Sequence, residues 1–381
     1  MLCGGVPAAP RRRRQAIGDT AATLMASSCV AGHYGRKAHG PAMKTGMLAL
    51  LLADIHVTRA AAPLRPAAGC LDLRADCGAG NGHQQDDDTR AFVECQRQLA
   101  STGGCVSIPP GEYQVMGVPL NTSNIHWQFS GSAVIKPFHA YTTNSDYTDL
   151  FIVGATNASG WNVAPRGEPK GPSLTPVTNV AFTGPSGGHM VIDMQHPPVC
   201  PWPVRGVRFG SVSNFSLHNV LVKQANNNTD PSLPCPGLRP ALSMSHGPDW
   251  NSPSYGHVEN ITALGGWPGY GLIQVQAATF VHFENLDSTG GVTLRMETGG
   301  DNGYVADITG NNIICRDGST ALMAGPHAQV NGKFNVKNLY AYSCTTVASA
   351  GGGFAQKGKP AGSFVSTQAI ILGSIKRWKL C

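Results

Sequence analysis

A short motif, an asparagine followed by an apolar residue, recurs at nearly constant spacing in the second half of the chain. Each occurrence opens a brief run of alternating apolar and polar residues: Asn219-Val220, Asn260-Ile261, Asn285-Leu286, Asn312-Ile313 and Asn338-Leu339. The last four are 25, 27 and 26 residues apart. A repeat of this length, built from short strands and turn residues, predicts a parallel β-helix in which each repeat forms one coil.

The asparagines should lie at turns, where their amides can hydrogen-bond to the backbone and to their counterparts in neighbouring coils. The 41-residue gap after Asn219 contains a long insertion rich in proline, glycine and asparagine, from Asn226 to Ser254. We place Asn179-Val180, a further 40 residues upstream, in the same series.

The composition agrees with a turn-rich all-β protein. Of the 381 residues, 47 are glycine and 27 are proline, and only 13% are charged, which argues against a helical bundle. The net charge of +6 is concentrated in residues 1–66, and the remainder of the chain is near neutral. We therefore expect no nucleic-acid partner. Since no apolar run reaches about 18 residues, we expect no membrane span either.

Residues 1–66 resemble a leader more than a folded domain. They are rich in alanine and arginine, and the short apolar run Met47–Ala53 follows Met43 and Lys44. This pattern is typical of a weak secretory signal that starts at an internal methionine; an organellar transit peptide and an over-extended reading frame are the alternatives. We expect a secreted protein, extracellular or in the cell wall, that folds without residues 1–66.

Cysteine usage agrees with secretion. Eight of the eleven cysteines lie between Cys70 and Cys344, an even number. Cys315 and Cys344 end equivalent repeats, so adjacent coils should bring them together in a disulfide. Cys200 and Cys235 flank the long insertion and are placed to staple it.

Residues 76–113 predict the capped start of the solenoid. Asp88 or Thr89 is placed to cap a helix that Gly103-Gly104 ends. The apolar positions of this helix are Ala91, Phe92, Cys95 and Leu99. A solenoid needs its open end covered, and an amphipathic helix suits that purpose. We interpret Asp86–Asp88 as capping and turn residues, not catalytic acids. The segment resembles the opening of pectate-lyase-like and polygalacturonase-like β-helix proteins, which indicates architecture and not substrate.

Polar side chains on three successive coils are candidates for a functional site. In Gly290–Asp301, apolar Val292, Leu294 and Met296 alternate with Thr293, Arg295 and Glu297. The second set gives one strand face an arginine and a carboxylate, which form either a solvated ion pair or the floor of a substrate groove. Gln274 and Gln276 take outward positions one coil earlier, and His327 lies one coil later. Because coils stack about 4.8 Å apart, these side chains should share one outer face.

Residues 272–303 and 321–344 resemble the core of the iota-carrageenase family, glycoside hydrolase family 82. The likeness covers about residues 255–345, and its β-helix character extends back to about residue 70. The resemblance implies inverting hydrolysis of a sulfated algal galactan on a right-handed β-helix. It implies Glu297 as general acid, Gln274 (less favoured, Gln276) and His327 as supporting site residues, and Arg295 as a sulfate contact.

The sequence departs from the family where the second acid is expected. That position, two residues after Glu297, is Gly299, and the next carboxylate is Asp301. Residues i and i+2 of a strand lie about 6.6 Å apart, which fits the roughly 6.5–9.5 Å of an inverting pair. Residues i and i+4 lie about 13 Å apart in an extended strand. Asp301 is therefore a tentative base that requires Gly299-Gly300 to bend the chain.

Taken together, the sequence predicts an all-β right-handed parallel β-helix over 67–345 with an N-terminal capping helix. A leader over 1–66 and an irregular tail over 346–381 flank it, although Ala369–Leu372 is a candidate last strand. The expected function is hydrolysis of β-1,4 bonds in an iota-carrageenan-like galactan by a monomer. We expect no required cofactor and assign no metal ligands, with room for a structural calcium or chloride ion. The alternatives are a non-catalytic β-helix that binds cell-wall polysaccharide and a pectin-type hydrolase or lyase.

Overall fold

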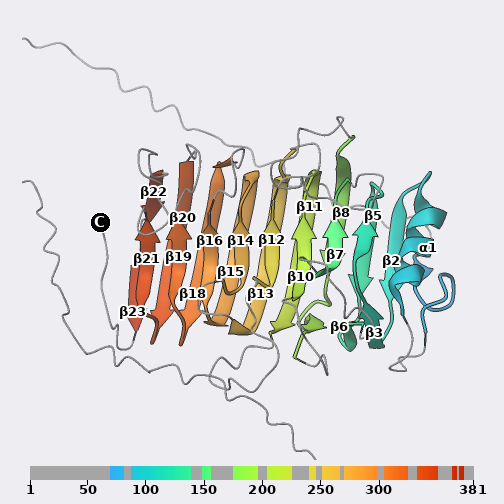
Figure 1. Ribbon diagram of the computed structural model, residues 1–381, viewed down its shortest axis with the longest axis horizontal. Coiled ribbons are helices and arrows are strands. Elements are labelled where there is room, and N and C mark those ends of the chain that lie inside the picture. Colours follow the sequence, from blue (N-terminus) through green and yellow to red (C-terminus); the bar gives the residue numbers. More distant parts are fainter. Residues whose placement is uncertain are drawn as a thin grey trace, which may run out of the picture. The chain divides into compact units, whose positions relative to one another are not determined.

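The computed structural model describes residues 69–80, 87–138, 148–155, 175–195, 204–224, 240–245, 251–266, 270–297, 304–324, 333–350, 363–366 and 369–372. The expected leader, Cys200, Cys235, Asp301 and His327 lie outside these residues. The described part consists of two parallel sheets and one helix, α1 (Thr89–Leu99) (Figure 1). Within it, no helix is long and apolar enough to cross a membrane.

The larger sheet has fifteen strands, and we call it the long sheet. Its strands are β1 (Leu71–Asp72), β2 (Gly104–Ile108), β3 (Gly111–Val115), β5 (Ile125–Phe129), β6 (Ala133–Pro137), β8 (Val177–Thr183), β9 (Met190–Asp193), β11 (Val212–Lys223), β13 (Ser254–Gly266), β15 (Ala278–Gly290), β17 (Val305–Ala306), β18 (Ile308–Arg316), β20 (Lys333–Tyr342), β22 (Ser363–Ser366) and β23 (Ala369–Leu372).

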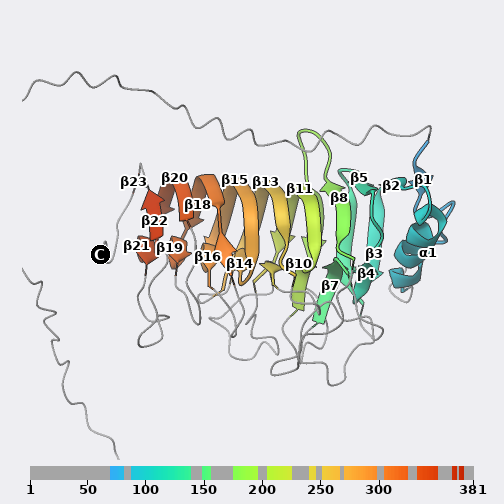
Figure 2. The same cartoon turned by 90° about the horizontal axis from the view of Figure 1, so that it is seen from above.

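The smaller sheet has eight strands, and we call it the short sheet. Its strands are β4 (Val118–Leu120), β7 (Thr148–Val153), β10 (Val204–Phe209), β12 (Leu242–Met244), β14 (Ile273–Val275), β16 (Val292–Met296), β19 (Thr320–Ala324) and β21 (Thr346–Ala350). From β13 to β21 the chain visits the two sheets in turn, apart from the short β17, and every strand pair is parallel. This is the predicted right-handed parallel β-helix (Figure 2).

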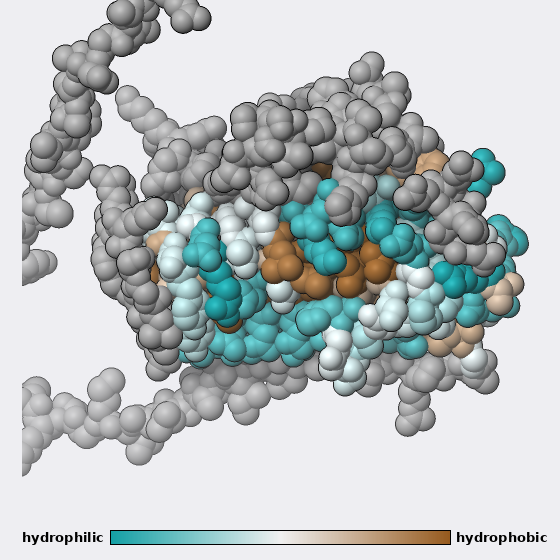
Figure 3. Space-filling model, turned by 90° about the horizontal axis from the view of Figure 1, so that it is seen from below, coloured by the Kyte–Doolittle hydropathy of each residue, from teal (hydrophilic) through white to brown (hydrophobic). Residues whose placement is uncertain are grey.

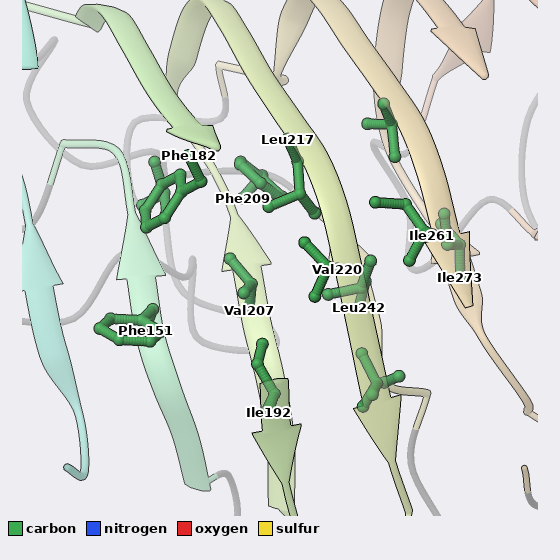
Figure 4. Packing of buried hydrophobic residues seen from close by; sticks show 14 of the residues in the cluster. Phe151, Phe182, Ile192, Val207, Phe209, Leu217, Val220, Leu242, Ile261 and Ile273 are labelled. Carbon is green, nitrogen blue, oxygen red and sulfur yellow. The ribbon is translucent and has the colours of Figure 1, made fainter. Parts of the chain in front are cut away.

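Stacked apolar side chains fill the space between the two sheets. One row consists of Val220, Ile261, Leu286 and Ile313, which are register partners on successive strands and are fully buried. Figure 4 shows such residues from both sheets pointing toward one another. Because each coil supplies the same inward positions, the alternating sequence pattern produces one continuous core.

The predicted asparagine ladder is confirmed at the repeats that set the period. The amides of Asn260, Asn285 and Asn312 each donate to the asparagine oxygen of the preceding coil, at 3.1, 2.9 and 2.8 Å. All three backbones are left-handed, with φ between 53° and 61°. Asparagine tolerates this conformation better than most residues, and its amide supplies the cross-coil bond. Asn338 departs from the pattern, since its amide donates to Asn311 instead.

The placement of Asn179 in that series is wrong. Its amide donates to Asn124 and its oxygen accepts from Asn214, and Val180 is the register partner of Phe215. These three asparagines form a second ladder at the other bend of the long sheet. Both bends use a left-handed residue followed by an apolar one, so spacing alone did not separate them.

Helix α1 covers the first coil, as predicted, but its N-terminus is held differently from the expected cap. Asp88 occupies the N-cap position without a capping side-chain bond; its carboxylate accepts from the N–H groups of Gly80 and Gln114. Asp87 instead accepts from the N–H of Thr89, at 3.0 Å. The aspartates are therefore turn-forming residues, which agrees with their non-catalytic interpretation.

The buried side of α1 packs on aromatic residues of the first coils. The Phe92 ring lies 5.4 Å from Trp127 and 5.2 Å from Phe151. Disulfides Cys77–Cys95 and Cys70–Cys105 tie the same region together. A hydrophobic face and covalent links thus hold the cap on the solenoid.

At the other end, the predicted disulfide between Cys315 and Cys344 is present. The two sheets continue beyond residue 345 through β21, β22 and β23, where the sequence indicated an irregular tail. Ala369–Leu372 is β23, the candidate last strand.

The outer surface mixes polar and apolar character. Figure 3, seen from below, shows hydrophobic residues gathered in the middle of this face with hydrophilic residues around them. Tyr255 and Phe280 are among the exposed large hydrophobic residues, and their rings stack 5.0 Å apart on neighbouring coils. Cross-coil stacking therefore stabilises the outside of the solenoid as well as its core.

Candidate functional site

The candidate site lies on β14 and β16, adjacent strands of the short sheet. Gln274 is the register partner of Arg295, and the N–H of Glu297 donates to the carbonyl of Val275 at 2.8 Å. Val292, Leu294 and Met296 are buried in the core, as the alternation predicted. Strand alternation then puts Arg295 on the opposite face of β16, beside Gln274.

Three side chains meet at one carboxylate oxygen. Gln274 Nε2 donates to Glu297 Oε2 at 2.9 Å, and Arg295 Nε forms an ion pair with the same oxygen. The Arg295 guanidinium also lies over the Tyr270 ring, 4.6 Å from its centroid. The amide and the guanidinium therefore fix the position of Glu297, and the aromatic ring helps to hold Arg295.

The sequence allowed a solvated ion pair between Arg295 and Glu297, and the structure excludes that alternative. Only 5% of the Arg295 side chain and 8% of the Glu297 side chain are exposed. In such surroundings both charges lose most of their hydration, so their mutual contact and the Gln274 bond must compensate. A carboxyl group held in this way is suited to transferring a proton to or from a bound ligand.

The remaining predicted residues are placed as follows. Gln276 follows the end of β14 and is half-buried, with its N–H donating to the carbonyl of Met244 on the preceding coil. Asp301 and His327 lie outside the described residues. The structure thus brings Gln274, Arg295 and Glu297 together. Gln276 lies just beyond the end of β14.

A row of buried polar residues, which was not predicted from the sequence, continues across the same sheet. Arg208 on β10, Ser243 on β12, Gln274 and Arg295 are register partners on four successive strands. All four are less than 7% exposed. Ser243 Oγ has no hydrogen-bond partner among the described residues. A row of buried polar side chains is costly, which indicates a functional surface.

The row ends at a second buried ionic group. Arg205 donates twice to Asp149, and Arg208 Nη1 lies 3.6 Å from the same carboxylate. Arg208 Nε also donates to Ser245 Oγ at 3.0 Å. The signal in the sequence was the pair of arginines in the otherwise apolar strand Val204–Phe209, but their partner Asp149 is 56 residues away from Arg205.

The Gln274–Arg295–Glu297 group does not suit a metal ion. It offers one carboxylate, and the guanidinium beside it would repel a cation. Among the described residues, one cluster of histidine and carboxylate side chains has metal-ligand spacing, and it lies on the long sheet.

The chain is similar in sequence to known iota-carrageenases. No family model matches the chain. It is 29% identical to an iota-carrageenase of Zobellia galactanivorans over 291 residues, covering 74% of this chain and 53% of that protein. It is 30% identical to an iota-carrageenase of Alteromonas macleodii over 303 residues, covering 76% and 54%. The chain therefore spans about half the length of these curated relatives.

A solved structure of an iota-carrageenase complexed with iota-carrageenan fragments has the same fold. It superposes with a TM-score of 0.61 at 26% identity, covering 75% of this chain and 57% of that one. The structural similarity therefore agrees with the sequence similarity: both relate this chain to iota-carrageenases.

Proposed function

Because the chain belongs to the iota-carrageenase family, we propose that it hydrolyses β-1,4 bonds of an iota-carrageenan-like sulfated galactan with inversion of the anomeric centre. The observation that carries the proposal is the buried group in which Gln274 and Arg295 hold one oxygen of Glu297. The carrageenan fragments bound to the related structure support a polysaccharide ligand.

In this proposal Glu297 is the general acid. It gives its proton to the glycosidic oxygen as the bond to the anomeric carbon breaks. Gln274 keeps the carboxyl group in place because its amide donates to Oε2. Burial keeps competing water from the carboxyl group, so the bound substrate is the acceptor for its proton.

Arg295 would bind a sulfate group of the substrate. Guanidinium groups bind sulfate through paired N–H donors. Because Arg295 contacts Glu297, a sulfate bound there would hold the substrate next to the proposed acid.

We assign the base to Asp301, which would take a proton from the water that attacks from the opposite face of the sugar. The assignment requires Gly299-Gly300 to shorten the path from Glu297 to roughly 6.5–9.5 Å between the two carboxyl groups. His327 and Gln276 are proposed as further contacts around the reacting sugar. The proposed enzyme is a secreted monomer that needs no cofactor. The disulfides among the described residues support secretion, because disulfides persist in oxidising compartments.

The test uses the full chain and measures reducing ends released from iota-carrageenan. Glu297→Gln keeps the shape of the side chain and loses the proton donor, so turnover should fall about 10²–10⁴-fold while oligosaccharide binding persists. Glu94→Gln makes the same chemical change at an exposed position of α1 and should leave turnover unchanged. Proton NMR of the first product would report inversion.

Other outcomes would support the competing functions. Wild-type binding of iota-carrageenan without release of reducing ends would favour the non-catalytic polysaccharide-binding β-helix. Cleavage of pectin with no action on sulfated galactans would favour the pectin-type alternative. Full activity of Glu297→Gln would remove Glu297 from the mechanism, and full activity of Asp301→Asn would do the same for the proposed base.

A further inference from the structure

Four histidines lie on the outer face of the long sheet, which the proposed reaction does not use. His126 is on β5, His218 on β11, His257 on β13 and His282 on β15. Figure 2 shows β11, β13 and β15 side by side. Two glutamates share the face: Glu259 is the register partner of both His218 and Glu284.

Three of these side chains converge on one point. His218 Nδ1 lies 3.4 Å from Glu259 Oε2, and His257 Nε2 lies 3.7 Å from the same oxygen. The three candidate ligand atoms are all within 4.8 Å of one another. The side chains are between 24% and 45% exposed, so an ion can reach them from solvent.

The two distances are longer than those of ordinary hydrogen bonds and close to the spacing between ligand atoms of one metal ion. An N–H···O bond spans about 2.7–3.2 Å, which both contacts exceed. Ligand atoms at about 2.0–2.2 Å from Zn²⁺ lie about 3.4 Å apart in a tetrahedral site. The next coil supplies an internal comparison, because the His282–Glu284 contact is an ordinary hydrogen bond at 3.0 Å.

We propose that His218, His257 and Glu259 form a binding site for a divalent transition-metal ion of the Zn²⁺ type, with water as the fourth ligand. Two imidazole nitrogens and one carboxylate oxygen are a ligand set that this ion accepts. The ion would link β11 to β13, and thus two successive coils.

Charge and surroundings agree with this site. The register partners Glu259 and Glu284 put two carboxylates on adjacent strands, and a cation beside Glu259 would offset their repulsion. Glu284 is itself held by His282 and by Asn311 Nδ2, and Lys337 is the next register partner in that row.

The test is a titration of the full chain with Zn²⁺, after its free thiols have been alkylated so that cysteines do not compete. Wild type should bind one equivalent saturably and melt at a higher temperature with the ion than without it. Co²⁺ should give the visible absorption of a tetrahedral site. His257→Ala and Glu259→Gln should each weaken binding by about tenfold or more and abolish that absorption.

His126→Gln is the matched control, because this histidine lies on the same face but bonds to Thr183 and Gln128. It should leave the affinity for Zn²⁺ unchanged. Circular dichroism establishes that each variant is folded, and the exposure of His257 makes its truncation tolerable. Absence of saturable Zn²⁺ binding by wild type, or equal affinity in His257→Ala and Glu259→Gln, would overturn the proposal. Carrageenan cleavage is a separate readout, so either result can be obtained whether or not the chain is a hydrolase.

Discussion

Arg295 and Glu297 lie two residues apart on β16, and their ion pair is almost completely withdrawn from solvent. An isolated buried charge is far more costly than a buried pair, so each residue depends on the other. The same contact that would position the acid also makes it a determinant of stability. The two roles can be separated by experiment.

Replacing Arg295 by Ala should destabilise the fold as well as weaken sulfated ligands. It removes the guanidinium while Glu297 stays buried, and breaking such a pair costs about 3–5 kcal/mol. The double variant Arg295→Met, Glu297→Gln removes both charges and should recover most of the free energy of unfolding. Urea unfolding of the wild type, of Arg295→Met, of Glu297→Gln and of the double variant completes the cycle. Equal stability of Arg295→Ala and wild type would contradict the prediction.

The ladder residue Asn285 makes two cross-coil bonds and has a left-handed backbone. Its amide donates to Asn260, its oxygen accepts from Asn312, and its φ is 53°. Asn285→Ala should lower the free energy of unfolding by about 2–4 kcal/mol, because both hydrogen bonds are lost and alanine is strained at positive φ. Asn285→Gly is the matched control: it relieves the strain and still loses the bonds, so it should cost less. Equal losses in the two variants would show that backbone strain contributes nothing.

The parts of the structure that follow one fixed period could be predicted from the sequence. Asn260, Asn285 and Asn312 are nearly evenly spaced, and each does occupy the same bend one coil further along. The same regularity placed Cys315 next to Cys344. In a solenoid, equal spacing becomes spatial adjacency, so a repeat in sequence directly predicts contacts.

Contacts across irregular gaps could not be predicted in this way. Arg205 meets Asp149 across 56 residues, and His218 meets Glu259 across 41, because insertions of different length separate those coils. The signal for the histidine cluster was present, since His257-Val258-Glu259 and His282-Phe283-Glu284 repeat 25 residues apart. Burial of Arg295 and Glu297 was also beyond the alternation pattern, which distinguishes the two faces of a strand but does not reveal what covers the outer face.

Stability should fall as the pH is lowered below about 6.5, the ordinary pKa of histidine. Burial lowers the pKa of His126, and the nearby His218 lowers it further. The unfolded chain therefore binds more protons than the folded chain in this range, so this contribution is complete above about pH 6.5 and is lost as the pH falls. His218 and His257, whose pKa values burial also lowers, act in the same direction beside Glu259 and Glu284. His126→Gln should show a weaker dependence of the free energy of unfolding on pH between 5 and 7.5, measured by urea unfolding with chelator present. The slope should be smaller by no more than about 2.3RT per pH unit, the value for one titrating group. An identical slope would contradict the assignment to His126.

The cap helix gives the most direct test of how the solenoid begins. Phe92 is fully buried and touches Trp127 and Phe151, so Phe92→Ala removes a ring that joins α1 to the first two coils. The cost should be about 3–5 kcal/mol, since a large cavity would open where the helix covers the core. Val93→Ala is the matched control on the same helix, because this side chain is 40% exposed and should change stability by less than about 0.5 kcal/mol.

Disulfides Cys77–Cys95 and Cys70–Cys105 keep the segment attached, so the loss should appear as a lower unfolding midpoint together with faster hydrogen exchange in β2 and β5. Similar midpoints for the two variants would mean that the disulfides, and not the packing of Phe92, hold the cap in place.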